Sequence, residues 1–170
     1  PICVDVIFEI FEGGLTEIER IGIVGNKVFS DRRLRRVLDT KQAGLLRLFV
    51  RRDTFLADRI ELDKRLLTDF YNARGYIDFE VNDVNAELTE ENNAYFVTFN
   101  VREGQKFRVG EVTLTSERTD IDVEDFQIAI SAEKGDVYSP TLMEKNLSRL
   151  EARATQLGLD FVREIGRAHV

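Results

Sequence analysis

Residues 97–104, Val-Thr-Phe-Asn-Val-Arg-Glu-Gly, repeat the pattern of residues 6–13, Val-Ile-Phe-Glu-Ile-Phe-Glu-Gly, 91 positions earlier in the chain. In both stretches every second residue is apolar and the run ends at Glu-Gly, which predicts a half-buried strand followed by a turn. The match continues into the next expected strand, where Ile18, Ile21 and Ile23 correspond to Val109, Val112 and Leu114. Similarity at a fixed period predicts tandem copies of one supersecondary unit.

Two helices are expected after the first strand of the first copy. Ser30 is a good N-cap for the first helix, and Phe29 before it can pack on Leu34 as a hydrophobic staple. The second helix is predicted from four apolar residues at helical spacing and from Gly75, which supplies its stop. Those four residues are Leu56, Ile60, Leu67 and Tyr71.

The second copy has the same two helix patterns. Asp122 is the expected N-cap of its first helix, with Ile121 and Phe126 as the staple. Ser139 and Pro140 begin its second helix. The apolar stripe of that helix runs through Met143, Leu147, Leu150 and Ala154 up to Gly158. Gly158 follows Gly75 by 83 positions, so the loop between the helices is about eight residues shorter in the second copy.

Two further strands close the first copy. Ile77, Phe79 and Val81 alternate with polar residues, and Val84, Ala86 and Leu88 continue the alternation in the opposite phase. A β-bulge at Asn82-Asp83 would return the second set to the inward face. After a polar turn, alternating apolar residues from Tyr95 to Val101 form the last strand.

The repeating unit is therefore strand, helix, helix, strand, strand, which is an α+β fold. Residues 1–12 are the expected last strand of a preceding copy, 13–104 a complete copy and 105–163 an incomplete one. The last seven residues, 164–170, resemble the translation of a sequencing adapter, so we expect them to be a non-native tail. We expect 13–104 to fold independently and 105–170 alone to be poorly stable.

Composition argues against several classes of function. The net charge of −7 disfavours nucleic acid as a partner, because such binding rests on a basic surface. Cys3 is the only cysteine and His169, in the tail, the only histidine, so we expect no catalytic, metal or cofactor site. Acid pairs such as Asp122/Asp125 and Glu90/Glu91 stand at a helix start or a turn, where carboxylates cap and solvate.

One basic region stands out in this acidic chain. It runs from Arg32 to Arg52 with Asp39 as its acidic residue between those ends. The favoured explanation is a solvated helix face. The alternative is a contact with an acidic partner or with lipid phosphates. The residues of this basic contact patch are Arg32, Arg33, Arg35, Arg36, Arg47, Arg51 and Arg52, with Lys41 between them.

Taken in order, these elements resemble the POTRA domains of BamA-like outer-membrane protein assembly factors. The resemblance rests on Val24-Gly25-Asn26, on Phe29 with Ser30, on Phe70-Tyr71 through Gly75-Tyr76, and on the Glu-Gly strand end. It covers residues 4–163, and over 69–104 it is similar to the third and fourth POTRA domains. The second copy departs from it, since Ser116-Glu117 replaces Gly-Asn and Leu159 replaces Tyr76.

The resemblance implies a three-stranded mixed sheet covered on one face by two helices, with the second strand at an edge. It also implies a non-enzymatic periplasmic arm that precedes a carboxy-terminal membrane β-barrel. The implied partners are unfolded outer-membrane protein clients, accessory assembly lipoproteins and neighbouring POTRA domains. Clients would add a strand to the edge of the complete copy. That edge is Ile77, Asp78, Phe79, Glu80 and Val81.

Three other functional classes are open at this point. POTRA domains also occur in two-partner secretion and related transporters of the same superfamily. A cell-division protein with a single POTRA domain and a membrane helix is disfavoured by the repeat. An unrelated enzyme is disfavoured by the lack of a histidine before the tail. Barrel-like sequence after residue 163 of the full-length protein would separate these classes.

Overall fold

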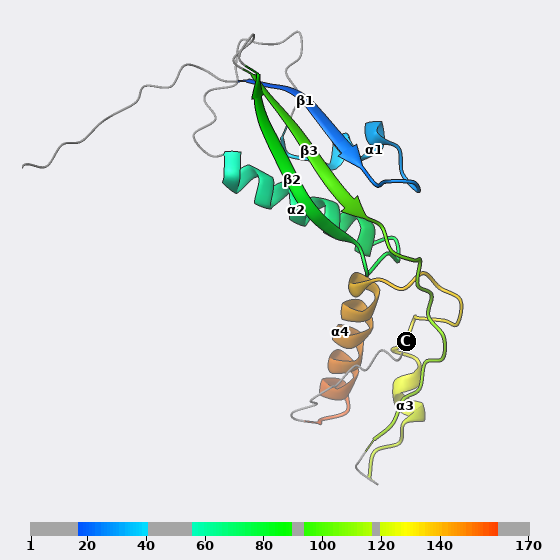
Figure 1. Cartoon of the computed structure of the whole chain (residues 1–170). Coiled ribbons are helices and arrows are strands. Elements are labelled where there is room, and N and C mark those ends of the chain that lie inside the picture. Colours follow the sequence, from blue (N-terminus) through cyan, green and yellow to red (C-terminus); the bar gives the residue numbers. More distant parts are fainter. Residues whose placement is uncertain (1–16, 41–55, 90–93, 117–119, 160–170) are drawn as a thin grey trace, which may run out of the picture. The chain divides into compact units, whose positions relative to one another are not determined.

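The structure of the chain is a computed structural model (Figure 1). It describes residues 17–40, 56–89, 94–116 and 120–159. The predicted strand at 1–12 and the tail at 164–170 lie outside the described residues, as do Arg47, Arg51 and Arg52. The elements follow the order β1, α1, α2, β2, β3, α3, α4. The first five reproduce the predicted strand, helix, helix, strand, strand.

Three strands form a mixed sheet in the order β1-β3-β2. They are β1 (Glu17–Val24), β2 (Glu80–Thr89) and β3 (Ala94–Arg102). β1 is parallel to β3 from Glu17↔Ala94 to Val24↔Asn100, with a register shift between Ile18 and Arg20. β2 runs opposite to β3 (Figure 1). The predicted α+β class with a three-stranded mixed sheet is confirmed.

Contacts divide the chain into two compact units, which we describe separately. The first contains residues 1–65 and 81–101, and the second contains 66–80 and 102–170. The boundary between Arg65 and Leu66 therefore runs through α2 (Leu56–Asn72). The division follows spatial contacts, and the repeat boundaries at 12, 104 and 163 stay a prediction.

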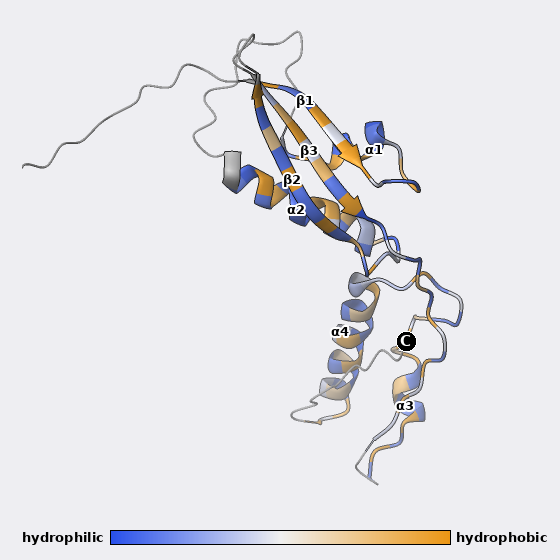
Figure 2. Ribbon diagram, viewed as in Figure 1, coloured by the Kyte–Doolittle hydropathy of each residue, from blue (hydrophilic) through white to orange (hydrophobic). Residues whose placement is uncertain are grey.

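The core of the first unit is the apolar face of β1 and β3 together with α1 (Asp31–Val37). Side chains two apart along a strand share a face, so the alternation read from the sequence places them inward. Its buried residues are Ile18, Ile21, Ile23, Leu34, Leu38, Val97, Phe99 and Val101. Figure 2 shows β1 and β3 as largely apolar and α1 as mostly hydrophilic.

The turn between β1 and α1 explains the Gly25-Asn26 pair. Gly25 has φ +97°, and a Cβ there would overlap the carbonyl oxygen of Val101, so glycine is the residue that fits. The Asn26 amide donates to the Phe29 carbonyl at 2.9 Å and to an Asp31 carboxylate oxygen at 2.8 Å. Ser30 is the N-cap, as predicted, and its carbonyl accepts the first helical bonds from the amides of Arg33 and Leu34, but its side chain makes no cap bond.

A β-bulge was expected to turn Val84, Ala86 and Leu88 toward the core, but Ala86 and Leu88 remain exposed. β2 runs unbroken from Glu80 to Thr89. Val84 is half-buried, whereas Ala86 and Leu88 are exposed, Leu88 at 50%. The inward position predicted for Ala86 and Leu88 is therefore wrong. Because β2 is an edge strand, its far half can leave the core while its ladder to β3 continues.

The second copy forms its helices as predicted. They are α3 (Glu124–Gln127) and α4 (Pro140–Gln156). Ser139 caps α4 by accepting from the amide of Leu142, and Pro140 is the first helical residue. At α3 the N-cap is Val123 rather than Asp122, whose carboxylate accepts from the amide of Glu124. The apolar core here is Phe126, Ala129, Leu150 and Ala154, with Ile121 packed against it.

The strand predicted at Val109, Val112 and Leu114 does not form. Arg108 makes an isolated antiparallel bridge to Val137, and no strand is assigned from 109 to 116. A strand needs a neighbour to satisfy its backbone groups. No described strand pairs with residues 109–116, so the sequence pattern alone cannot produce one.

Candidate partner-binding surfaces

The edge strand predicted to bind partners is present but begins later than expected. β2 lies at the outside of the sheet and starts at Glu80. Of the predicted site residues, Glu80 and Val81 belong to it. Ile77 and Asp78 form a turn and Phe79 is buried, so the placement of these three on the edge was wrong.

Packing of Phe79 is the reason for the shift. The amide of Phe79 donates to the Tyr76 carbonyl at 3.2 Å, which closes a turn. Its ring stacks on Tyr71, with centroids 4.0 Å apart and planes at 8°. Aromatic stacking and burial hold Phe79 in the core. The alternation of apolar residues from 77 to 81 fitted a strand, but it could not reveal this contact.

The exposed strand is polar along most of its length. Glu80 pairs with Arg102 across the sheet at 2.6 Å, and both side chains are exposed. Val81 and Val84 are half-buried. The exposed polar residues of β2 are Glu80, Asn82, Asp83, Asn85 and Glu87. Such a composition is typical of an edge that is protected against indiscriminate pairing.

The described part of the basic contact patch lies on α1. Arg32, Arg33 and Arg36 are exposed, and Arg33 stands over the Phe29 ring at 5.0 Å from its centroid. Arg35 is half-buried and donates to the Ile21 carbonyl at 3.2 Å, so it ties α1 to β1. One of the four arginines therefore has a structural role. The contact role of the others stays a prediction.

Sequence reasoning missed a buried polar pair at the end of α2 (Leu56–Asn72). The Tyr71 hydroxyl donates to a Glu103 carboxylate oxygen at 2.7 Å, and the two residues are 0% and 7% exposed. Burial, together with the hydrogen bond to Glu103, raises the pKa of Tyr71 above its ordinary value. Both residues belong to motifs singled out in the sequence, but only as markers of the fold.

A turn joins this pair to the chain that follows. Gly75 has φ +94°, and a Cβ there would lie 2.9 Å from the Phe107 carbonyl oxygen and 2.9 Å from a Val137 methyl. The Gly75 carbonyl accepts from the Phe107 amide at 2.8 Å. The end of α2 and the segment after β3 are thereby fastened together.

A second missed feature recurs in both copies. Asp63 on α2 is fully buried, and one carboxylate oxygen accepts from the amides of Asp39 at 2.6 Å and Thr40 at 3.3 Å. Asn146 on α4, 83 positions later, accepts from the amides of Ser131 at 2.6 Å and Ala132 at 3.3 Å. The signal available in the sequence was a polar residue within each apolar stripe, at the same repeat offset.

These acceptors have one function in the fold. In each copy, this side chain of the second helix accepts hydrogen bonds from backbone amides just after the first helix ends, where backbone groups lack helical partners. The other Asp63 oxygen and the Thr40 hydroxyl are buried without a partner among the residues that the structure describes.

In residues 17–40, 56–89, 94–116 and 120–159, no helix is long and apolar enough to cross a membrane. Within those ranges no group of three histidine, cysteine or acidic side chains is placed to hold a metal ion.

Comparison with known families decides the classification. Residues 16–104, which contain β1 to β3, match the POTRA family model, described as a surface antigen variable number repeat. The chain belongs to the POTRA family. The resemblance noted from the sequence is thus confirmed.

The curated proteins that this chain resembles in sequence include outer membrane protein assembly factors. The chain is 29% identical over 166 residues to BamA of Neorickettsia risticii, covering 98% of this chain and 22% of the relative. It is 27% identical over 155 residues to BamA of Neisseria meningitidis serogroup B, covering 91% of this chain and 19% of the relative. The chain thus spans about a fifth of the length of these relatives.

Solved POTRA structures share the fold. A crystal structure of BamA POTRA domains 3–5 from Haemophilus influenzae matches with a TM-score of 0.59 at 16% identity, over 84% of this chain and 54% of that one. BamA from Haemophilus ducreyi lacking POTRA domains 1–3 matches with a TM-score of 0.57 at 23% identity, over 80% and 24%. At these identities the likeness shows the fold alone.

Proposed function

We propose that this chain is part of the periplasmic POTRA arm of an outer-membrane protein assembly factor, and that it binds unfolded clients there. The names of the curated relatives support the first half of the proposal. They also favour it over a two-partner secretion transporter. The arm would act as a scaffold that passes clients toward a membrane β-barrel, with accessory lipoproteins and neighbouring POTRA domains as its other partners. Residues 13–104 would be one complete domain of the arm and 105–163 part of the next.

The observation that carries client binding is the position of β2. It spans ten residues at the outside of the sheet, and only β3 pairs with it among the described strands. An extended client could add a strand to its outer side through main-chain hydrogen bonds, which are largely indifferent to side-chain sequence. Each bond contributes only about 0.5–1.5 kcal/mol net, so binding would be weak and reversible. That property suits a scaffold that must release many different clients.

The test uses two neighbouring proline variants, Asn85→Pro and Ala86→Pro. Both residues are exposed in the middle of β2, away from the Glu80–Arg102 pair. Adjacent amides in an antiparallel strand point to opposite sides. One variant therefore loses a ladder bond to β3 and is destabilised, while the other loses only an outward donor and stays folded.

The measurement is titration of the ¹⁵N-labelled chain with a ten-residue peptide of alternating apolar and polar residues, the pattern of barrel strands. We expect amide shifts along residues 80–89 in the parent chain and their loss in the folded proline variant. Glu87→Gln, which changes charge but not the backbone, is the matched control and should bind like the parent. If the folded proline variant also binds like the parent, strand addition at β2 is wrong.

A further inference from the structure

The second half of β2 has two different faces. Successive side chains of a strand point to opposite sides, so the odd-numbered residues from 83 to 87 share one face and the even-numbered residues from 84 to 88 share the other. The odd-numbered face carries Asp83, Asn85 and Glu87, all exposed. The Asn85 amide donates to a Glu87 carboxylate oxygen at 3.4 Å, as expected of neighbours on one face. This face of the edge is acidic and polar.

The even-numbered face of the same stretch is apolar and carries Val84, Ala86 and Leu88. Val84 is half-buried, whereas Ala86 is exposed and Leu88 is 50% exposed. Removing such apolar surface from water is favourable. A strand that adds to the outer side of β2 would therefore gain by placing apolar side chains on this face.

The two carboxylates of the acidic face have no cation beside them. At the start of β2, Glu80 pairs with Arg102 at 2.6 Å. Among the residues that the structure describes, no lysine or arginine pairs in this way with Asp83 or Glu87. Across paired strands, opposite charges that face each other are stabilising and like charges are destabilising. The acidic face can therefore distinguish client strands by their charge.

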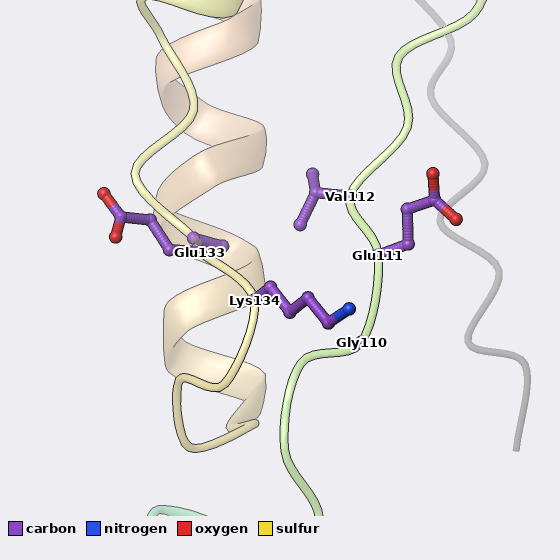
Figure 3. Close-up of a pocket in the computed structure, with 6 residues that line it drawn as sticks. Gly110, Glu111, Val112, Glu133 and Lys134 are labelled. Atoms are coloured by element: carbon purple, nitrogen blue, oxygen red, sulfur yellow. The ribbon is translucent and has the colours of Figure 1, made fainter.

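The second copy also carries exposed glutamates, but on a different kind of backbone. An open hollow of about 480 Å³ lies between Gly110–Val112 and Ala132–Lys134. Glu111 and Glu133 point away from it, while Lys134 reaches across it (Figure 3). These residues belong to no strand, so their backbone does not offer the regular row of groups to which an extended client pairs.

We propose that β2 selects client strands in which apolar and basic residues alternate, with the basic side chains facing Asp83 and Glu87. The inference rests on the strand addition proposed for β2 and names the kind of client that it takes. Directly opposite residues of paired strands have their side chains on the same face, whether the strands are parallel or antiparallel. The apolar side chains of the client then lie beside Ala86 and Leu88. A strand that alternates apolar and acidic residues meets two like charges and is rejected.

The test compares three ten-residue peptides that carry leucine at every second position, with lysine, serine or glutamate between. Each is titrated into the ¹⁵N-labelled chain at low ionic strength, and the amide shifts of residues 80–89 report binding. We expect the lysine peptide to bind about tenfold more tightly than the glutamate peptide, because attractive pairs are replaced by repulsive ones. The uncharged serine peptide measures strand addition alone and should bind with intermediate affinity. Salt screens exposed charges, so the difference should shrink at high ionic strength.

Charge reversal on β2 is the decisive comparison. The double variant Asp83→Lys/Glu87→Lys should invert the order of the peptides, so that the glutamate peptide binds most tightly. Both side chains are exposed, so folding should be preserved. The matched control is Glu111→Lys/Glu133→Lys, which changes the net charge by the same amount at exposed residues outside any strand. The control should keep the order found for the parent chain.

Leu88→Ser tests the apolar face. Loss of the exposed leucine should weaken all three peptides by a similar factor, about two- to fivefold, and leave their order unchanged. If no affinity changes, the apolar side chains of the client do not lie beside Leu88, and that part of the proposal is wrong.

Failure of charge selection and failure of strand addition give different results. If no peptide shifts the amides of residues 80–89, strand addition at β2 is wrong and charge selection with it. If all three peptides bind equally, strand addition stands and charge selection is wrong. If the two double variants change the order of the peptides alike, or neither changes it, the preference does not come from Asp83 and Glu87, which also overturns the inference.

Discussion

Residues 17–24 form β1, whereas the matched residues 108–115 form no strand beyond one bridge, although both have the same apolar pattern. The helices behave differently. α2 and α4 are both 17 residues long, and each is followed within three residues by a glycine with positive φ, Gly75 at +94° and Gly158 at +73°. Even the closing bonds agree, with Tyr76 donating to the Tyr71 carbonyl at 3.1 Å and Leu159 to Ala154 at 3.0 Å.

The difference reflects where each element finds its hydrogen bonds. A helix satisfies its backbone within one segment, and its caps lie a few residues away. A strand depends on a partner that is distant in sequence, and β1 finds it in β3, more than 70 residues later. The two copies therefore share what is local and differ in what is long-range.

The largest expected effect comes from replacing the two helix-ending glycines. Gly158→Ala meets no atom within 4 Å and should lose only the strain of a left-handed residue, about 1 kcal/mol. Gly75→Ala adds the clash with Phe107 and Val137, for about 2–4 kcal/mol in total. Native-state hydrogen exchange of the amides in α2 and α4 measures both. Equal losses would show that the Gly75 turn is not packed as described.

Tyr71→Phe probes the polar pair, which has no counterpart in the second copy because Ala154 stands at the matched position. Removing the hydroxyl leaves the buried Glu103 carboxylate without this donor and should cost about 1–3 kcal/mol. The parent should also show an alkaline dependence. In the folded chain the pKa of Tyr71 is raised above the value of about 10 that it has when unfolded. The protonated hydroxyl therefore contributes its full stabilisation below about pH 10, and this contribution to the free energy of unfolding is lost as the pH rises above that value.

Denaturation at several values between pH 8 and pH 11 checks that sign. Above pH 10 the parent should lose up to about 1.4 kcal/mol of unfolding free energy per pH unit from this group. The Phe variant should lack that component. A variant with the same alkaline slope as the parent would exclude Tyr71 as its source.

Exchanging the buried acceptors should have the smallest effect. Asp63→Asn places in the first copy the group that the second copy uses at Asn146, and the amide oxygen can accept the same two bonds. We expect a change within about 1 kcal/mol, whereas Asp63→Ala should cost about 1–3 kcal/mol by leaving the amides of Asp39 and Thr40 unpaired. Exchange rates of those two amides report the result. A large loss for Asp63→Asn would mean that the charge itself is required.

The candidate site was predictable only in part. That the second strand of the complete copy lies at an edge was expected through the family resemblance. The start of that strand was not, because residues 77–81 alternate equally well whether or not Phe79 stacks on Tyr71. Arg35 likewise looked like part of a basic contact patch, and its bond to the Ile21 carbonyl is visible only once α1 lies on β1.

The sequence by itself determined the order of elements, the helix ends and the existence of a repeat, because caps, glycines and apolar periods act over a few residues. Only the tertiary structure decided which strands form, where β2 begins, and which polar groups are buried in pairs such as Tyr71 with Glu103. These features depend on contacts between residues far apart in the chain. A stretch of alternating apolar and polar residues is compatible both with a paired strand and with no strand at all. The second copy carries the strand pattern, and its strand is absent where no described partner pairs with it.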